Sequence, residues 1–289
     1  MSLDSSTQRL SLGQCATLAC LLEATAPKAG NVHRGADFDD LTFHDFAASA
    51  VAIAPVIDAA AQRGIGRTIL DAISATRALV ATNTNLGIVL LLAPLAAIPR
   101  DEPLTAESAR GVLSRLTADD CRYVYEAIRL ARPGGLGKAP EMDVASEPPA
   151  DLLAAMRAAA DRDLVARQYA DDFRLVLDEA LKLLIAGRQQ GWSLTDAIIH
   201  THLQLLARYP DSLIVRKCGR ETAAQASNMA GSVLEAGNPG DEPYFEALAD
   251  FDFWLRADGH RRNPGTTADL LAAALFAGLR DHRLRPPYR

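Results

Sequence analysis

LGIVLLLAPLAAI, which spans Leu86–Ile98, is the most apolar run of the chain. Its composition suits either a buried strand or a buried helix, because periodicity does not separate the two in short apolar runs. No second strand-like segment lies nearby to pair with it, so we predict a central buried helix. The run is too short to span a bilayer and contains Pro94, so a membrane helix is not expected.

On both sides of this run, apolar residues recur at helical spacing. Upstream segments of this kind cover residues 10–24, 43–63 and 68–81, and Pro55 is expected to kink or break the second. Downstream, Thr105 and Thr117 are typical N-caps, and helical spacing returns in segments 151–187, 212–237, 244–258 and 266–280 and in a helix opened by Ser193. We therefore predict an all-α fold: one compact domain over residues 1–289 with about ten or more helices.

Composition excludes several classes of protein. Hydrophobic residues make up 49% of the chain but aromatic residues only 6%, so the core must be mainly Ala, Leu, Ile and Val, which favours helices. The formal net charge of −6 argues against a nucleic-acid partner. The four cysteines lack CxxC spacing, and the N-terminus lacks a signal-peptide pattern. We expect a soluble, cytoplasmic protein without a membrane partner.

One connector between two helical segments carries far more chemistry than a connector needs. It reads EATAPKAGNVHRGADFDDLTFHD from Glu23 to Asp45 and holds Lys28, Asn31, His33, Arg34, Asp37, Asp39 and Asp40. Its cations suit phosphate, its carboxylates suit a metal, and its imidazole suits proton transfer. The alternative is a solvated loop whose Asp39 and Asp40 cap the next helix. We interpret the whole cluster as part of an active site.

Two further polar islands interrupt apolar sequence. Thr82-Asn83-Thr84-Asn85 precedes the buried run. An N-cap role for Asn83 or Thr84 would explain only one of these residues. The hydroxyl groups or the base edge of a ligand would instead give the buried side-chain amides hydrogen-bond partners.

Arg216 and Lys217 form the next island and are expected near a helix start, where the macrodipole disfavours cations, so phosphate binding is one explanation. A solvated face with a Lys217–Glu221 pair is the other.

The last island runs from Arg261 to Asp269. Thr266 and Asp269 fit a capping box, and the helix N-terminus there would present N–H groups to an anion beside Gly265.

The Gly- and Pro-rich segment 132–150 is the best candidate for a mobile lid or an internal boundary. His200 and His202 are two residues apart, which rules out a zinc pair one helical turn apart, and we take both as structural or surface residues.

Taken in order, these motifs resemble the triphosphoribosyl-dephospho-CoA synthase family. The matching segments are Glu23 with Pro27–Gly30 and Asp37–Asp40, then Asn83–Gly87, then Pro264–Leu271. The family is all-helical and uses ATP unusually: it displaces adenine and passes the triphosphoribosyl unit to the 2′-hydroxyl of dephospho-CoA. The chain departs from it where Asn85 and Leu86 replace a His and a Lys, and where the acidic run lacks its usual His. These departures leave room for a different acceptor.

The resemblance implies substitution at the anomeric carbon of ATP, with Mg²⁺ as cofactor and ATP and a dephospho-CoA-like molecule as ligands. The roles it implies are phosphate binding by Lys28, Arg34, Arg216 and Lys217, metal binding by Asp39 and Asp40, a base among Glu23, His33 and Asp37, and substrate binding by Asn31, Asn83, Thr84, Asn85, Asn263, Gly265, Thr266 and Asp269. Two alternatives stay open. The first is an ATP-dependent enzyme of cofactor biosynthesis with another phosphorylated acceptor, and the second is a non-catalytic helical partner protein.

Overall fold

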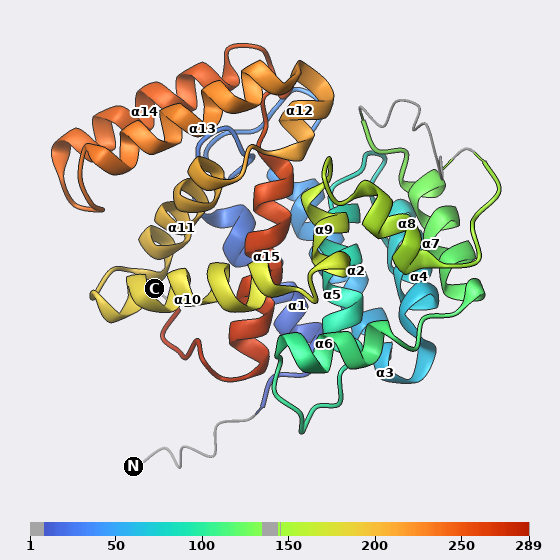
Figure 1. Ribbon diagram of the computed structural model, residues 1–289. Helices are drawn as coiled ribbons and strands as arrows, with labels where there is room; N and C mark the ends of the chain where they lie inside the picture. The colour runs from blue at the N-terminus through green and yellow to red at the C-terminus, as the bar shows by residue number, and fades with distance from the viewer. Residues whose placement is uncertain (1–8, 135–143, 145, 289) are drawn as a thin grey trace, which may run out of the picture.

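The computed structural model describes residues 9–134, 144 and 146–288 (Figure 1). These residues form fifteen α-helices and one π-helix, and β-structure among them is limited to two isolated bridges. The elements are α1 Leu12–Thr25, α2 Phe43–Asp58, α3 Ala60–Arg63, α4 Ile65–Leu79, α5 Leu86–Ala97, α6 Ala106–Leu113, α7 Ala118–Ala131, α8 Leu152–Ala159, α9 Leu164–Ala170, η1 Leu175–Ala180, α10 Leu181–Gln189, α11 Leu194–Arg208, α12 Ser212–Cys218, α13 Arg220–Glu235, α14 Glu242–Arg256 and α15 Gly265–Arg280. The all-α prediction is confirmed.

Two helices, α5 and α15, form the centre of the fold. Nearly every residue of each is buried, and the two pack against each other (Figure 1). A helix that is apolar all round has no face to offer to water, so it must be enclosed by other helices. The predicted central helix at Leu86–Ile98 is thus confirmed as α5. Among the described residues, none of the helices is both long and apolar enough to cross a membrane.

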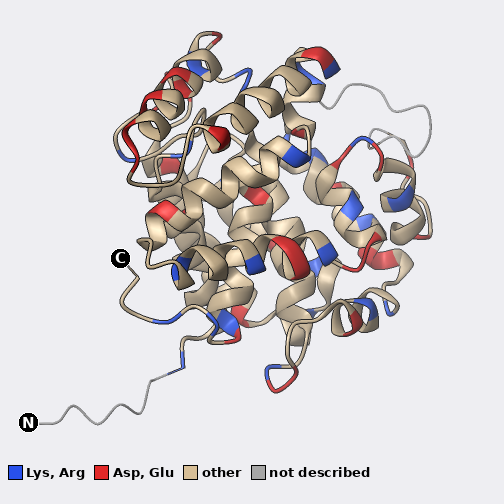
Figure 2. Ribbon diagram, turned by 60° about the vertical axis from the view of Figure 1, so that its left-hand side comes forward, with Lys and Arg blue, Asp and Glu red and all other residues tan. Residues whose placement is uncertain are grey.

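The outer helices pack around this pair. α1 lies against α2 and α15, α4 lies against α7, and α11 lies against α13 and α15. The approach of α4 to α7 needs a glycine, because a Cβ at Gly66 would come within 2.4 Å of the Cα of Asp120. Acidic and basic residues are interspersed along the outer helices (Figure 2). α13 and α14 run side by side at one corner of the molecule (Figure 1).

The capping residues explain several helix starts. Thr105 and Thr117 are N-caps, as predicted, and each accepts a hydrogen bond from the third helical amide within a capping box. Ser193 likewise accepts from the amide of Asp196 at 3.0 Å. α2 continues through Pro55 and ends at Asp58, so the predicted helix 43–63 divides into α2 and α3 a few residues beyond the proline.

Two local predictions are wrong. α15 already begins at Gly265, so Thr266 lies inside its first turn and caps nothing; its Oγ1 instead accepts a hydrogen bond from the hydroxyl of Ser212 at 3.0 Å. Arg216 lies in the last turn of α12 and not near a helix start, because Gly219, with φ of 91°, ends that helix before α13. The macrodipole favours a cation at that end.

The two histidines of α11 are structural, as expected. His200 packs between the rings of Trp192 and Tyr244. His202 is fully buried, and burial lowers its pKa to about 3, so its ring is neutral.

Candidate active site

A cavity of about 730 Å³ lies between the central helices and the 82–85 turn. Its volume falls within the usual range for sites that hold small molecules or cofactors. α1, α5 and α15 contribute to its wall, together with residues of α7, α8, α9 and α12. The wall contains twelve of the predicted site residues: Glu23, Asn31, Asp40, Asn83, Thr84, Asn85, Arg216, Lys217, Asn263, Gly265, Thr266 and Asp269.

Five predicted site residues do not line the cavity: Lys28, His33, Arg34, Asp37 and Asp39. Asp37 accepts a hydrogen bond from the amide of Phe43 at 2.6 Å, at the start of α2. The Nδ1 of His33 accepts from the amide of Gly35 at 3.2 Å, and burial is the main cause that lowers the pKa of this imidazole. Arg34 and Asp39 are exposed.

Lys28 is fully buried and forms an ion pair with Glu23. Its Nζ lies 2.8 Å from Oε1 of Glu23 and also donates to the backbone carbonyls of Glu23 and Ala26. These three acceptors match the three N–H groups of an ammonium ion. Lys28 therefore neutralises Glu23 behind the cavity wall and does not face the cavity as a phosphate ligand would.

Asp269 projects from α15 against the first turn of α5. A Cβ at Gly87 would lie 2.0 Å from Oδ2 of Asp269, so the carboxyl group needs a glycine at that position. No described residue donates a hydrogen bond to this carboxyl group. Burial, and next the charge of Glu23, raise the pKa of Asp269 well above its usual range, while Arg216 lowers it.

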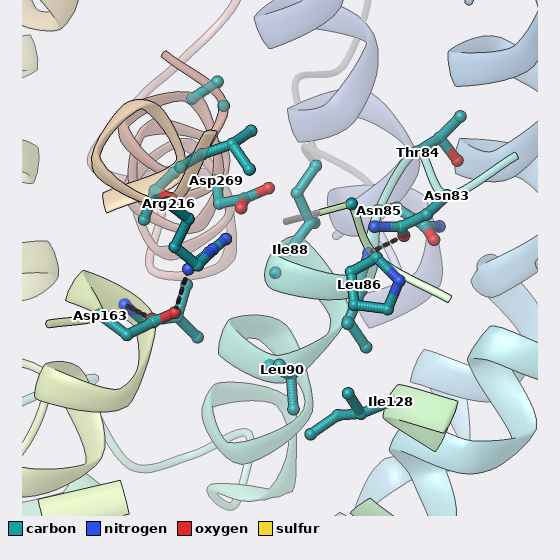
Figure 3. Close-up of a pocket in the computed structure, with 18 of the residues that line it drawn as sticks. Asn83, Thr84, Asn85, Leu86, Ile88, Leu90, Ile128, Asp163, Arg216 and Asp269 are labelled. Carbon is teal, nitrogen blue, oxygen red and sulfur yellow. Dashed lines mark hydrogen bonds and ion pairs between the residues drawn. The ribbon is translucent and has the colours of Figure 1, made fainter. Parts of the chain in front are cut away.

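Arg216 enters the cavity from the last turn of α12 and pairs with Asp163 (Figure 3). Asp163 also caps α9, since its Oδ1 accepts from the amides of Val165 and Ala166 at 2.8 and 3.1 Å. One carboxylate thus begins a helix and orients the guanidinium group. The next residue, Lys217, is half-buried, and burial is the main cause that lowers its pKa.

Asp211 fixes the direction of α12. Its Oδ1 accepts from the amides of Leu213 and Ile214, and its Oδ2 accepts from the amide and the hydroxyl of Thr267 at 2.7 and 2.8 Å. Burial raises the pKa of Asp211, and these four donors oppose that effect. A single buried carboxylate therefore joins the start of α12 to α15, which carries Asp269.

The polar side chains of the 82–85 turn form only some of their possible hydrogen bonds within the protein. Asn83 accepts from the amide of Leu86, the first residue of α5, at 3.1 Å, but the N-cap position itself is Asn85, so the predicted N-cap role of Asn83 or Thr84 is wrong. Thr84 shares a hydrogen bond with Ser49 at 2.5 Å. The side-chain nitrogen of Asn85 donates to Thr76 at 2.9 Å, whereas its buried oxygen has no partner in the described part of the chain.

The turn that follows α1 presents a second amide of this kind. Asn31 donates to the side-chain oxygen of Asn263 at 2.7 Å, and its own side-chain oxygen is buried without a partner in the structure described. The loop is held to α14 by Asp252, which accepts from the amide of Gly30 at 2.7 Å, and by Arg256, which donates to the carbonyl of Asn31.

The cavity has a polar side and an apolar side (Figure 3). Arg216 and Asp269 lie across from Asn83, Thr84 and Asn85, and apolar side chains occupy the space below them. The apolar lining comes from α5, α7, α8 and α9 and includes Leu90, Val124, Ile128, Met156 and Val165. This arrangement suits a ligand that has both a polar and an apolar part.

Several cavity residues escaped sequence analysis: Arg132, Arg162, Asp163, His260 and the apolar lining. Asp163 lies within the predicted helical segment 151–187, where the sequence analysis placed neither a helix start nor a site residue. His260 follows a glycine in an exposed turn, and its Nδ1 lies 2.9 Å from Oδ1 of Asp40, more than two hundred residues away. No local pattern encodes a contact of that range.

The segment 132–150, predicted to be a mobile lid or an internal boundary, borders the cavity. Gly134 and Val144 line it, while residues 135–143 and 145 lie outside the described residues. Within the described chain, no group of three or more His, Cys, Asp or Glu side chains could hold a metal ion.

Comparisons with known proteins show the family of the chain and a similar fold. The model of the family described as ATP:dephospho-CoA triphosphoribosyl transferase matches residues 9–287. The fold is similar to the crystal structure of a candidate triphosphoribosyl-dephospho-CoA synthase from Archaeoglobus fulgidus, with a TM-score of 0.62 and 27% sequence identity, over 84% of this chain and 99% of the other. No curated protein matches the chain.

Proposed function

The chain belongs to the ATP:dephospho-CoA triphosphoribosyl transferase family, and from that premise we propose that it moves the triphosphoribosyl unit of ATP to the 2′-hydroxyl of dephospho-CoA and releases adenine. One observation carries the proposal. The three motifs, around Glu23, Asn83 and Asp269, are far apart in the sequence and meet in one cavity with cations on its wall. Such convergence is what a group transfer between two bound substrates requires.

The triphosphate fits the cationic part of the wall. Arg216 and Lys217 come from α12, and Arg132 and Arg162 line the same cavity. A guanidinium group binds two phosphate oxygens at once, whereas an ammonium group acts as a point charge. Lys28 has no part in this contact, since its three N–H groups are already used by Glu23 and Ala26.

Mg²⁺ fits this wall as an ion carried by the nucleotide. Asp40 is the one member of the proposed Asp39–Asp40 pair that lines the cavity, and His260 occupies only its Oδ1. Mg²⁺ bound to nucleotides commonly uses one or two carboxylates and takes its other ligands from phosphate and water. Bound there, it would supply charge neutralisation of the triphosphate.

Glu23 is the proposed base for the acceptor hydroxyl. Of the three candidates, Glu23, His33 and Asp37, only Glu23 lines the cavity. Its Oε1 lies 2.8 Å from the ammonium group of Lys28, which holds the carboxyl group in place at the cavity wall. A carboxylate in this position also stabilises the positive charge that develops on the ribose as the glycosidic bond breaks.

A second candidate, with another phosphorylated acceptor, is favoured by one observation. Leu86 stands where the family carries a Lys, and it is buried in the cavity wall. An apolar side chain there removes a cation that an anionic acceptor would contact. The ribosyl donor side, with Arg216 and Asp269, is unchanged by this difference.

The test is chromatography and mass spectrometry of incubations with Mg-ATP and a panel of acceptors. We expect adenine together with an adduct that carries the triphosphoribosyl mass when dephospho-CoA is present. Adenine release with cell extract but not with dephospho-CoA would show that the acceptor is a different molecule. Absence of adenine with every acceptor, combined with no thermal stabilisation by Mg-ATP, would overturn the proposal and favour a non-catalytic partner protein.

A further inference from the structure

Several carboxyl groups gather at the polar side of the cavity, and most have donors of their own. Glu23 is paired with Lys28 at 2.8 Å. Asp163 is paired with Arg216 and accepts two backbone amides of α9. Each of these two carboxyl groups therefore has a cation within ion-pair distance, and Asp163 has two backbone donors as well.

Asp211 also has hydrogen-bond donors, although no cation pairs with it. It accepts four hydrogen bonds, two of them from Thr267, and these donors oppose the rise in its pKa that burial causes. Asp269 differs from all of these. It receives no hydrogen bond from any described residue and lies near the negative charges of Glu23, Asp211 and Asp163.

The proton balance of this cluster follows from the contacts. Lys28 forms an ion pair with Glu23, and Arg216 forms one with Asp163. Both oxygens of Asp211 accept hydrogen bonds from the protein. The remaining carboxyl group, Asp269, has the raised pKa that this arrangement demands, and the Cys20 thiol beside it stays neutral because burial raises its pKa as well. A protonated carboxyl group that faces a cavity is a hydrogen-bond donor and a proton source.

The reaction has a use for such a donor. When the bond between C1′ of the ribose and N9 of adenine breaks, both electrons stay on the base. Adenine leaves far more easily as a neutral molecule than as an anion, so a proton has to reach a ring nitrogen, N7 or N3, as the bond lengthens. Meanwhile the acceptor hydroxyl loses its proton as the new bond from its oxygen to C1′ forms.

We propose that Asp269 is the general acid that protonates the departing adenine, while Glu23 accepts the proton of the acceptor hydroxyl. This inference rests on the proposed function. One proton leaves the Asp269 carboxyl group for the base, one arrives at Glu23, and the pair is reset through solvent after product release. Asp269 stands beside the apolar wall formed by Ile88 and Leu90, which suits a purine ring (Figure 3).

The test compares Asp269→Asn with the wild type on two donors, ATP and N7-methyl-ATP, with dephospho-CoA as acceptor. The N7-methylated base is already cationic and departs as a neutral molecule without a proton. With ATP we expect kcat of the Asn variant to fall by about 10²–10⁴-fold, the usual contribution of a general acid. With N7-methyl-ATP we expect the variant to stay within about tenfold of the wild type, because no proton is needed.

Glu23→Gln is the matched control, because the acceptor hydroxyl must lose its proton with either donor. We expect it to be slow on both. The wild type should lose activity on ATP as the pH rises and Asp269 ionises, and this loss should be absent with N7-methyl-ATP. Equal loss of Asp269→Asn on both donors would overturn the acid role and leave a binding or metal-holding role. A wild type that releases no adenine from ATP would instead refute the proposed function itself.

Discussion

At the scale of single residues, the Lys28–Glu23 pair is the most deeply buried ion pair of the described chain, with side chains 0% and 5% exposed. Removing one partner of such a pair leaves an unpaired charge in an apolar setting. We expect Lys28→Met to lower the free energy of unfolding by about 3–5 kcal/mol, as measured by urea denaturation at pH 7.

The matched control is the double variant Lys28→Met/Glu23→Gln, which removes both charges. It should recover part of the lost stability because no charge is left unpaired. A Lys28→Met protein as stable as the wild type, with only weaker ATP binding, would contradict the buried pair and restore Lys28 as a phosphate ligand.

Gly87 tests the contact between α5 and Asp269. A Cβ at this position would lie 2.0 Å from Oδ2 of Asp269, so Gly87→Ala must displace the carboxyl group. For the proposed general acid, we expect a displacement of about 1 Å to lower kcat by about 100-fold. Gly111→Ala is the control: it also lies in a helix, a methyl group added there would meet nothing within 4 Å, and we expect unchanged activity. Equal activity of both variants would show that Asp269 need not hold its position.

Asp269 also sets a pH dependence of stability. In the unfolded chain its carboxyl group ionises near 3.8, while in the folded chain burial and the charges of Glu23, Asp211 and Asp163 raise the pKa, against the effect of Arg216. Above 3.8 the unfolded state therefore binds fewer protons than the folded state, and stability falls as the pH rises toward the folded pKa.

Asp269→Asn cannot ionise and should escape this loss. We expect its Tm to exceed that of the wild type at pH 7 and the difference to shrink toward pH 4. Circular dichroism melts across this range provide the measurement. A variant less stable than the wild type at pH 7 would mean that the ionised carboxylate is stabilised in the fold.

At the scale of elements, α12 is a short helix with its direction set by one buried residue. Asp211 caps it and holds it to Thr267 of α15, and this link places Arg216 and Lys217 on the cavity wall. We expect Thr267→Val, which removes one of the two bonds, to cost about 1 kcal/mol of stability and to weaken Mg-ATP binding severalfold in calorimetry.

Ser232→Ala is a suitable comparison, since it removes one exposed side-chain bond within α13. Its stability should change by less than about 0.5 kcal/mol, with no change in ATP affinity. Normal ATP affinity of Thr267→Val would show that the position of α12 does not depend on Asp211.

The elements also show where sequence reasoning succeeds. Apolar periodicity and N-cap residues are local, so Leu86–Ile98 and the caps at Thr105 and Thr117 were predictable. The start of α15 was not, because Thr266 and Asp269 satisfy the capping-box pattern although their side chains serve Ser212 and the cavity. Local patterns do not register which tertiary contact a side chain makes.

At the scale of the whole molecule, the cavity exists because α5 and α15 bring distant motifs together. The ordered motifs allowed Glu23, Asn83 and Asp269 to be placed in one site from sequence. Which further residues line the cavity could not be predicted, because Arg162 and His260 reach it only through the packing of the helices. Lys28 was assigned to phosphate by residue type, and only the fold shows its partner.

The central claim is that this cavity transfers the triphosphoribosyl unit of ATP. The most direct measurement is adenine release from Mg-ATP in the presence of dephospho-CoA, by the wild type and by Arg216→Met. We predict that the wild type forms adenine and adduct in equal amounts and that Arg216→Met, which lacks one of the proposed phosphate ligands, forms neither at a comparable rate. Release of ADP or AMP in place of adenine, or an Arg216→Met protein as active as the wild type, would contradict the claim.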